Sequence, residues 1–344
     1  MINTLTVAAA VSLLCCIVSI SLRGPRLLEF DRESTVPLRG IMALLVIIGH
    51  LWGASGRTSE WLATFKCGGS AVAVFFFMSG YGYEKMMSVK GAGYLNGLFP
   101  RTLKKLVVPL LLATVAYCLV TYFYVGNFRP LKLLLGYGHG GTGFLPHSWY
   151  VYKLLFFVLG FSLIRRRFGQ SGIWLFTAVT VTAFQFVLKW RGWWFGSDWS
   201  FPVGMTFAAF EPKIRALISR RPLLTYFTLL VMLGIAMAIS VQILPKQSMF
   251  LTRLPNYLLG PVFALTLYEF RLPKLVGLGA ISYEIYLCQG VFEFSLWKIG
   301  MPLWAYVVAA YVGTVLLAWL VHIASAAVAK LAVGSRLSPE QKAR

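Results

Sequence analysis

The chain alternates long apolar runs with short polar connections that are rich in Lys and Arg. Eleven apolar segments can be marked off, at about 4–22, 37–51, 71–83, 106–125, 148–164, 173–188, 201–210, 223–244, 254–270, 278–297 and 303–328. Most are long enough for a helix that crosses a bilayer, although 71–83 and 201–210 are short. The pattern predicts an all-α polytopic membrane protein with about eleven transmembrane helices.

Composition supports this class. Of the 344 residues 58% are hydrophobic and only 12% are charged, which is too apolar for a soluble domain. The formal net charge of +21 would suggest nucleic-acid binding in a soluble protein. Here the basic residues lie in short connections between apolar runs, so we expect membrane lipids and no nucleic acid as partners.

The chain divides into three parts by pattern. Residues 1–36 hold a first apolar helix and a basic linker, residues 37–329 hold the other apolar segments, and residues 330–344 form a polar tail. The first segment has no positively charged start, so we expect a retained helix rather than a cleaved signal peptide, which stays the alternative. The sequence shows no repeat of fixed period, coiled coil or separate soluble domain.

The loop charges predict an orientation. With the N-terminus outside, 22 of the 32 Lys and Arg residues fall in segments that face the cytoplasm. This asymmetry fits the positive-inside rule and places the polar tail in the cytoplasm. It also puts Arg39 toward the cytoplasmic end of its helix and His50 toward the outer half. A multi-pass protein of the cell membrane is therefore expected.

Arg39 and His50 are the candidate catalytic residues. They lie 11 residues apart in PLRGIMALLVIIGHL (37–51), where every residue between them is apolar or glycine. At about 100° per residue they share one stripe of a helix, roughly 16 Å apart along its axis. Ionisable residues in such a segment are costly in lipid and suggest function. The alternatives are an interfacial anchor for Arg39 and a helix–helix hydrogen bond for His50.

The cysteines and histidines do not predict a metal. The five cysteines show no CxxC spacing, and the four histidines form no HExxH motif. Neither a disulfide framework nor a zinc site is indicated, so we expect no metal.

Several motifs, in order, resemble the membrane-bound acyltransferase family 3, the integral-membrane O-acyltransferases of bacterial surface carbohydrates. The similarity extends from about Leu38 to Leu320, and its anchor is the arginine and histidine of LRGIMALLVIIGH. The other matching motifs are VFFFMSGYGY (74–83), RTLKKLVVP (101–109), HSWYVY (147–152), FPVGM (201–205) and ISYEIYL (281–287). Two positions depart from the family: Val36 stands where an aspartate is frequent, and Gln289 where a histidine is common.

The resemblance implies a ten-helix acyltransferase core preceded by one extra helix. It also implies transfer of an acyl group, usually acetyl, from acyl-CoA to a hydroxyl of a carbohydrate or lipid-linked glycan. Acyl-CoA would be a donor substrate, with no permanently bound cofactor. A neutral histidine suits this chemistry because an alcohol is a poor nucleophile until a base takes its proton. His50 is accordingly the expected general base.

Further residues are candidates for substrate binding. Arg101 and Lys105, in the basic stretch expected inside, could hold the donor's phosphates, although plain anchoring of the helix is the alternative. His147, Trp149 and Tyr150 open a helix at the outer side and could line the acceptor site, although Trp and Tyr also populate interfacial belts. Glu284, within SYEIYL, is the acid expected to face the interior.

Two other classes of function fit the apolar pattern. A transporter or flippase would also use polar residues inside a helix bundle, but it should show inverted repeats, and no second Arg–His pattern occurs. The second alternative is an inactive acyltransferase-like membrane component, which the Gln289 departure keeps open and the Arg39–His50 pair opposes.

The topology can be tested with tags. A tag on Arg344 should be cytoplasmic, because the basic segments that include the tail are assigned to the inside. A tag placed in the Gly136–Gly143 loop should be accessible from outside, because that loop lies between segments assigned to the opposite side. Accessibility to an impermeant reagent in intact cells measures both positions. Finding the two tags on one side would rule out eleven crossings.

Overall fold

A computed structural model describes residues 3–56, 59–125, 145, 147–183, 196–243, 248–272 and 277–334, and this part of the chain is helical, without strands. Its elements are α1 Thr4–Arg23, α2 Arg32–Ala54, α3 Glu60–Thr64, α4 Gly68–Lys90, η1 Ala92–Leu95, α5 Leu98–Val125, α7 Trp149–Thr182, α8 Ser200–Arg220, α9 Pro222–Gln242, α10 Met249–Thr252, α11 Leu254–Glu269, α12 Ser282–Trp297 and α13 Leu303–Gly334. The tagging loop at 136–143 and most of the polar tail lie outside the described residues.

Within the described residues, six helical stretches are long and apolar enough to cross a membrane: α1, α2, α3 with α4, α5, α9 and α13. The predicted all-helical class is confirmed, whereas the predicted count of eleven is not. Among the described helices, the other predicted segments correspond to α7, α8, α11 and α12. Of these, α11 and α12 have only 16 residues each, and α7 and α8 carry several charges.

The helix that carries Arg39 and His50 begins earlier than predicted. The predicted segment begins at Pro37, but α2 begins at Arg32 and Pro37 lies inside it. The cause is a capping box at Asp31: its carboxylate accepts from the N–H of Ser34 at 2.8 Å, and the Asp31 N–H donates to Ser34 Oγ at 3.0 Å. The division predicted between residues 36 and 37 therefore falls within a helix. At the other end of the chain, α13 runs to Gly334, so it includes the first five residues of the predicted tail.

Two predicted segments, 148–164 and 173–188, are joined in α7. The helical pattern changes direction at Gly169, where φ is 63° and ψ is −155°. Glycine adopts a positive φ without the steric cost that other residues meet. The basic run Arg165–Arg167 lies at the end of the first helical part of α7, one residue before this turn.

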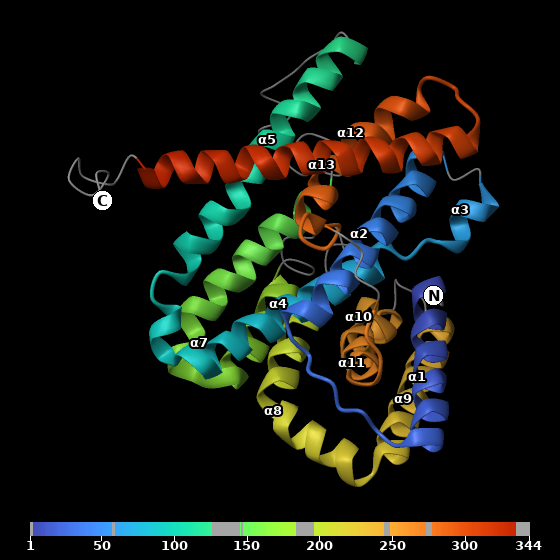
Figure 1. The fold of residues 1–344 in the computed structure, drawn as a ribbon, viewed down its shortest axis with the longest axis vertical. Helices are drawn as coiled ribbons and strands as arrows, with labels where there is room; N and C mark the ends of the chain where they lie inside the picture. The colour runs from blue at the N-terminus through green and yellow to red at the C-terminus, as the bar shows by residue number, and fades with distance from the viewer. Residues whose placement is uncertain are drawn as a thin grey trace.

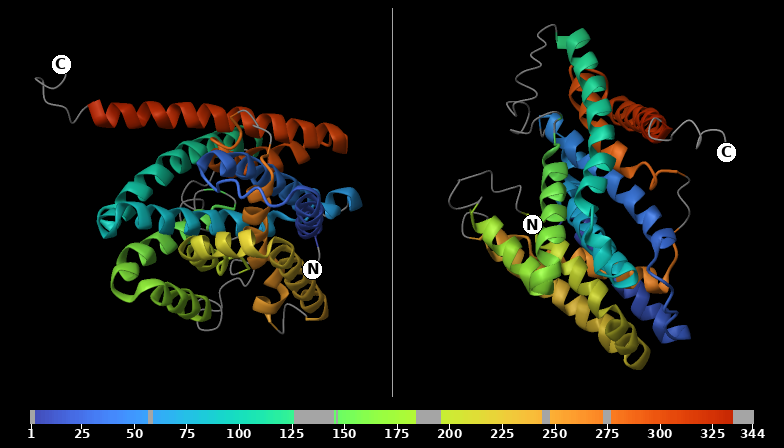
Figure 2. Two further views of the ribbon diagram at one scale, coloured as in Figure 1. Left: turned by 60° about the horizontal axis from the view of Figure 1, so that its bottom comes forward. Right: turned by 90° about the vertical axis from the view of Figure 1, so that its left-hand side faces the viewer.

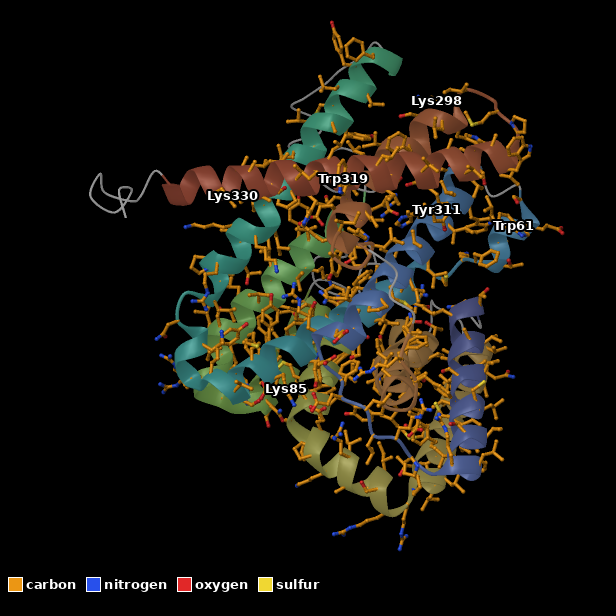
Figure 3. All side chains as sticks on the ribbon, in the orientation of Figure 1. Trp61, Lys85, Lys298, Tyr311, Trp319 and Lys330 are labelled. Carbon is orange, nitrogen blue, oxygen red and sulfur yellow. The ribbon has the colours of Figure 1, made fainter. Side chains whose placement is uncertain are left out.

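The helices are arranged around α2 and α4. Figure 2 (left panel) shows α13 on one side of the molecule and α8 and α9 on the other, with α2 and α4 between them. In Figure 1, α13 crosses α12 and α2, and α1 lies beside α9 at one edge. Figure 3 labels Tyr311 where α13 meets α2; its hydroxyl donates to the carbonyl oxygen of Leu44 at 2.8 Å.

The phenylalanine-rich run of α4 forms an aromatic core. The ring of Phe76 lies 5.6 Å from that of Phe157 in α7, and the ring of Phe77 lies 5.5 Å from that of Phe207 in α8. Phe157 also stacks on Phe201 at 4.9 Å. Edge-to-face and stacked pairs at these distances stabilise packing beyond area burial alone. This run therefore holds α4, α7 and α8 together.

Two glycines let α4 and α8 approach backbone to backbone. A Cβ atom added at Gly80 would lie 2.0 Å from the carbonyl oxygen of Phe201, and one added at Gly204 would lie 2.1 Å from that of Phe77. Small residues at a contact of this kind allow close helix packing in membranes. The glycine of FPVGM (201–205) thus permits the close packing of α8 on α4.

We expect Gly80→Ala and Gly204→Ala to destabilise the protein by about 1–3 kcal/mol each, since the added methyl group overpacks a rigid backbone contact. The unfolding midpoint in detergent is the measurement. Gly234→Ala in α9 is the matched control, because nothing lies within 4 Å of its added Cβ. That control should be neutral or slightly stabilising. Equal midpoints for all three variants would contradict the close contact.

Candidate functional site

α2 is held in place at two glycines near the residues of interest. A Cβ added at Gly279 would lie 1.9 Å from the carbonyl oxygen of Val36, and one added at Gly49 would lie 3.0 Å from the backbone nitrogen of Gly68. The first contact fixes the end of α2 near Arg39 against the turn before α12. The second fixes the end near His50 against the start of α4.

His50 lies against His147. The two imidazole rings are stacked, with centroids 3.8 Å apart and an interplanar angle of 9°. His147 Nε2 is 3.2 Å from Glu293 Oε2, and Glu293 is 3% exposed. The structure thus brings together residues from α2, from the turn before α7 and from α12.

The backbone of His147 is in a conformation that favours glycine. Its φ is +65°, and the hydroxyl of Tyr286 in α12 donates to its carbonyl oxygen. Non-glycine residues in the left-handed region are uncommon, and they persist when the surrounding structure over-determines them. The stacked ring and the Tyr286 hydrogen bond are two such determinants.

Gln289 is a third neighbour of His50, from α12. Its side chain is 2% exposed, and its Nε2 donates to the carbonyl oxygen of Tyr286 at 3.0 Å. Gln289 Oε1 and His50 Nδ1 are both buried and have no hydrogen-bond partner among the described residues. Buried polar atoms are usually paired, so these two are exceptions that call for an explanation.

Arg39 has no carboxylate partner in the described part of the chain. Its Nε is buried without a hydrogen-bond acceptor, and its titratable neighbours are Arg32 and Tyr150. The buried acids contact other groups: Glu84 with Arg165, Glu211 with Lys85, Asp198 with Lys153, Glu269 with the N–H of Arg26, Glu284 with His322 and Glu293 with His147. Arg39 is therefore a partly buried cation whose hydrogen-bonding capacity is not filled by protein.

Tyr150 and Trp149 begin α7 and are buried, each 6% exposed. The Tyr150 ring lies 5.0 Å from that of Phe76 and 5.1 Å from that of Tyr286. Tyr150 therefore contacts both α4 and α12, close to the His147 turn. The structure stacks His147 on His50 and places Trp149 and Tyr150 directly after the His147 turn, and their role in substrate binding stays a prediction.

Arg101 and Lys105 lie apart from the His50 cluster, on exposed positions of α5. Arg101 donates to the carbonyl oxygens of Asn96 at 2.9 Å and Tyr94 at 2.9 Å, so its guanidinium clamps the turn that contains η1. Arg166 donates to Asn96 Oδ1 at 2.8 Å. Basic side chains from α5 and α7 thus meet at one surface.

Glu284 lies elsewhere. Its Oε1 is 2.9 Å from Nδ1 of His322 in α13. Five residues along a helix correspond to a rotation of about 500°, so Glu284 and Gln289 point some 140° apart on α12. The structure therefore places Glu284 toward α13 and away from the His50 cluster.

His50, His147 and Glu293 also form a group whose potential ligand atoms lie within 4.8 Å of one another. Two histidines and a carboxylate suit Zn²⁺ by chemistry. An imidazole binds a metal along the lone pair in its ring plane, however, and nearly parallel stacked rings have no such point in common. As arranged, the two histidines do not fit one metal ion, and one ring would have to turn.

Gln289, Glu293 and Tyr286 were not among the site residues predicted from the sequence. Gln289 and Glu293 lie four residues apart in an otherwise apolar segment, which places them on one face of a helix. That spacing was a usable signal. The strained turn at His147, by contrast, depends on a contact with α12 that the sequence does not reveal.

A comparison with known families gives a match over most of the chain. A family model described as an acyltransferase domain matches residues 38–323, from α2 into α13. No curated protein and no solved structure matches the chain. The matched range includes Arg39, His50, His147, Gln289 and Glu293, and six of the helical stretches can span a membrane. The chain is thus a multi-pass membrane acyltransferase that belongs to acyltransferase family 3.

Proposed function

We propose that the protein moves an acyl group, acetyl in the first instance, from acyl-CoA to a hydroxyl of a carbohydrate or lipid-linked glycan, with His50 as general base. The observation that carries the proposal is the half-buried His50, stacked on His147, on the helix that also carries the unpaired Arg39. Perturbed or unsatisfied polar groups in an apolar interior are candidates for function.

The reaction needs a proton acceptor near the hydroxyl. The hydroxyl oxygen attacks the thioester carbonyl carbon, its proton passes to His50, and the carbon–sulfur bond breaks. The imidazolium then returns the proton to the leaving thiolate. A base placed in this way typically accelerates a reaction by about 10²- to 10⁴-fold.

The carbonyl oxygen becomes negative as the hydroxyl adds, so donors are needed beside it. The indole N–H of Trp149 and the hydroxyl of Tyr150 are the side-chain candidates, since both residues open α7 next to the His147 turn. His147, Trp149 and Tyr150 are proposed to line the acceptor side, at the end of α2 expected to face outside.

Arg39 is proposed to bind the donor. It lies roughly 16 Å along α2 from His50, toward the end expected to be cytoplasmic. A guanidinium without a protein acceptor can donate to the donor's polar arm or its phosphates. Arg101 and Lys105, with Arg166 close by, would bind phosphates at the inner surface. The membrane would be the cell membrane, because acyl-CoA is cytosolic and surface glycans are assembled there.

Replacing His50 separates this role from a structural one. His50→Ala should lower acyl transfer by about 10²- to 10⁴-fold. Loss of a helix–helix hydrogen bond costs only about 0.6 kcal/mol, so the unfolding midpoint should stay near that of the wild type. Release of thiol from acetyl-CoA measures the rate. The matched control is His322→Gln, which keeps a donor for Glu284 in another apolar helix. A His50→Ala enzyme that works at the wild-type rate would refute the mechanism.

The donor site predicts an effect of charge. Lys105→Glu should weaken acetyl-CoA binding several-fold, and binding by the wild type should weaken as salt rises, because exposed contacts to phosphate are screened. Titration of the purified protein with acetyl-CoA is the measurement. Arg101→Glu should weaken binding too, but it also removes the clamp on the Tyr94–Asn96 turn, so Lys105→Glu is the cleaner variant.

Lys298→Glu is the control for charge alone. Lys298 follows α12 at the end remote from the basic surface of α5, and Figure 3 labels its position far from Lys85 and Lys330. Unchanged donor affinity in Lys105→Glu and Arg101→Glu would contradict phosphate binding by these residues and would leave only anchoring of the helix as their role.

A further inference from the structure

His50 Nδ1 and Gln289 Oε1 are buried atoms without a hydrogen-bond partner in the part of the chain that the structure describes, and they belong to two neighbouring side chains. Gln289 Oε1 can only accept a hydrogen bond, whereas His50 Nδ1 is a donor in one neutral tautomer and an acceptor in the other. If Nδ1 carried the lone pair, both atoms would be buried acceptors and neither could pair with the other. With a proton on Nδ1, the imidazole can donate to the carboxamide oxygen.

The orientation of the Gln289 carboxamide is fixed by a second contact. Its Nε2 donates to the carbonyl oxygen of Tyr286 at 3.0 Å. Turning the amide over would set Oε1 against that carbonyl, acceptor to acceptor, and would lose the hydrogen bond. Tyr286 also holds the His147 carbonyl through its hydroxyl. Tyr286 of α12 therefore contacts both His147 and Gln289, two of the three neighbours of His50.

Burial distinguishes the two ring nitrogens of His50. Nδ1 is sealed from solvent, whereas the residue as a whole is only half-buried. The accessible part of the residue therefore does not include Nδ1. The other charged or titratable groups facing this ring are His147 and Glu293, which lie 3.2 Å from each other. A hydroxyl that reaches the ring from outside the protein therefore cannot use Nδ1, which leaves Nε2 as the nitrogen able to take its proton.

We propose that Gln289 is a positioning residue that holds neutral His50 in the Nδ1–H tautomer, so that Nε2 is the nitrogen that takes the acceptor's proton. The role of Nε2 as proton acceptor rests on the proposed acyl transfer, whereas the tautomer does not. During the reaction Nδ1–H stays bonded to Oε1, the hydroxyl proton passes to Nε2, and it leaves from Nε2 to the thiolate sulfur.

The tautomer can be read directly by ¹⁵N NMR of protein labelled at histidine. The chain has only four histidines, and the signal absent from His50→Ala identifies His50. At alkaline pH, where the rings are neutral, the wild type should show a protonated Nδ1 and an unprotonated Nε2 at His50. Gln289→Leu should lose this preference, and Gln289→Glu, which keeps an acceptor oxygen, should retain it. Gln242→Leu, an exposed position in α9, is the control and should leave the His50 signal unchanged.

In the same protein variants, the rate of acyl transfer should change together with the tautomer of His50. Gln289→Leu should release thiol from acetyl-CoA at least about tenfold more slowly than the wild type, with Gln289→Glu restoring most of the loss. A wild-type His50 protonated on Nε2, or a tautomer and rate unaffected by Gln289→Leu, would overturn the proposal. A wild type that shows the expected spectrum and releases no thiol contradicts the acyl transfer, and it leaves the assignment of the tautomer to Gln289 standing.

Discussion

The cost of burying an unpaired polar group in an apolar helix bundle governs this structure. Each buried polar atom without a partner costs about 1–3 kcal/mol, and a charged group costs more. The six buried carboxylates of the described residues all have at least one partner, which ties α4 to α7 and α8, and α12 to α13. Of the eight buried side-chain atoms that lack a hydrogen-bond partner within the described residues, those of Arg39, His50 and Gln289 belong to the proposed site, where a ligand or a neighbouring side chain can pair them.

Close backbone contacts position these groups. The Gly279 and Gly49 contacts hold the two ends of α2, and the Gly80 and Gly204 contacts hold α4 against α8. Rigid contacts of this kind transmit position because neither backbone can move without a clash. The distance between Arg39 and His50 is consequently set by one helix, while their surroundings are set by three others, α4, α7 and α12.

The site combines a strained turn with a rigid helix. His147 adopts a positive φ and is tied to α12 by Tyr286, and Tyr286 also orients Gln289. Two of the three neighbours of the His50 ring are therefore held by one tyrosine in SYEIYL (282–287). The SYEIYL motif thus has a physical role, because its residues in α12 arrange the groups around His50 of α2. Glu284 of the same motif instead pairs with α13.

The sequence by itself determined the helical class, the position of most helices and the stripe shared by Arg39 and His50, because hydrophobic periodicity and spacing are local properties. It also placed His147, Trp149 and Tyr150 at the start of a helix. It missed the start of α2, because the Asp31 cap begins the helix at Arg32 and the predicted segment began at Pro37. Only the tertiary structure decided that His147 stacks on His50, that Glu284 faces α13 and that Gln289 adjoins His50. Those facts depend on contacts between helices far apart in the chain, which no local pattern encodes.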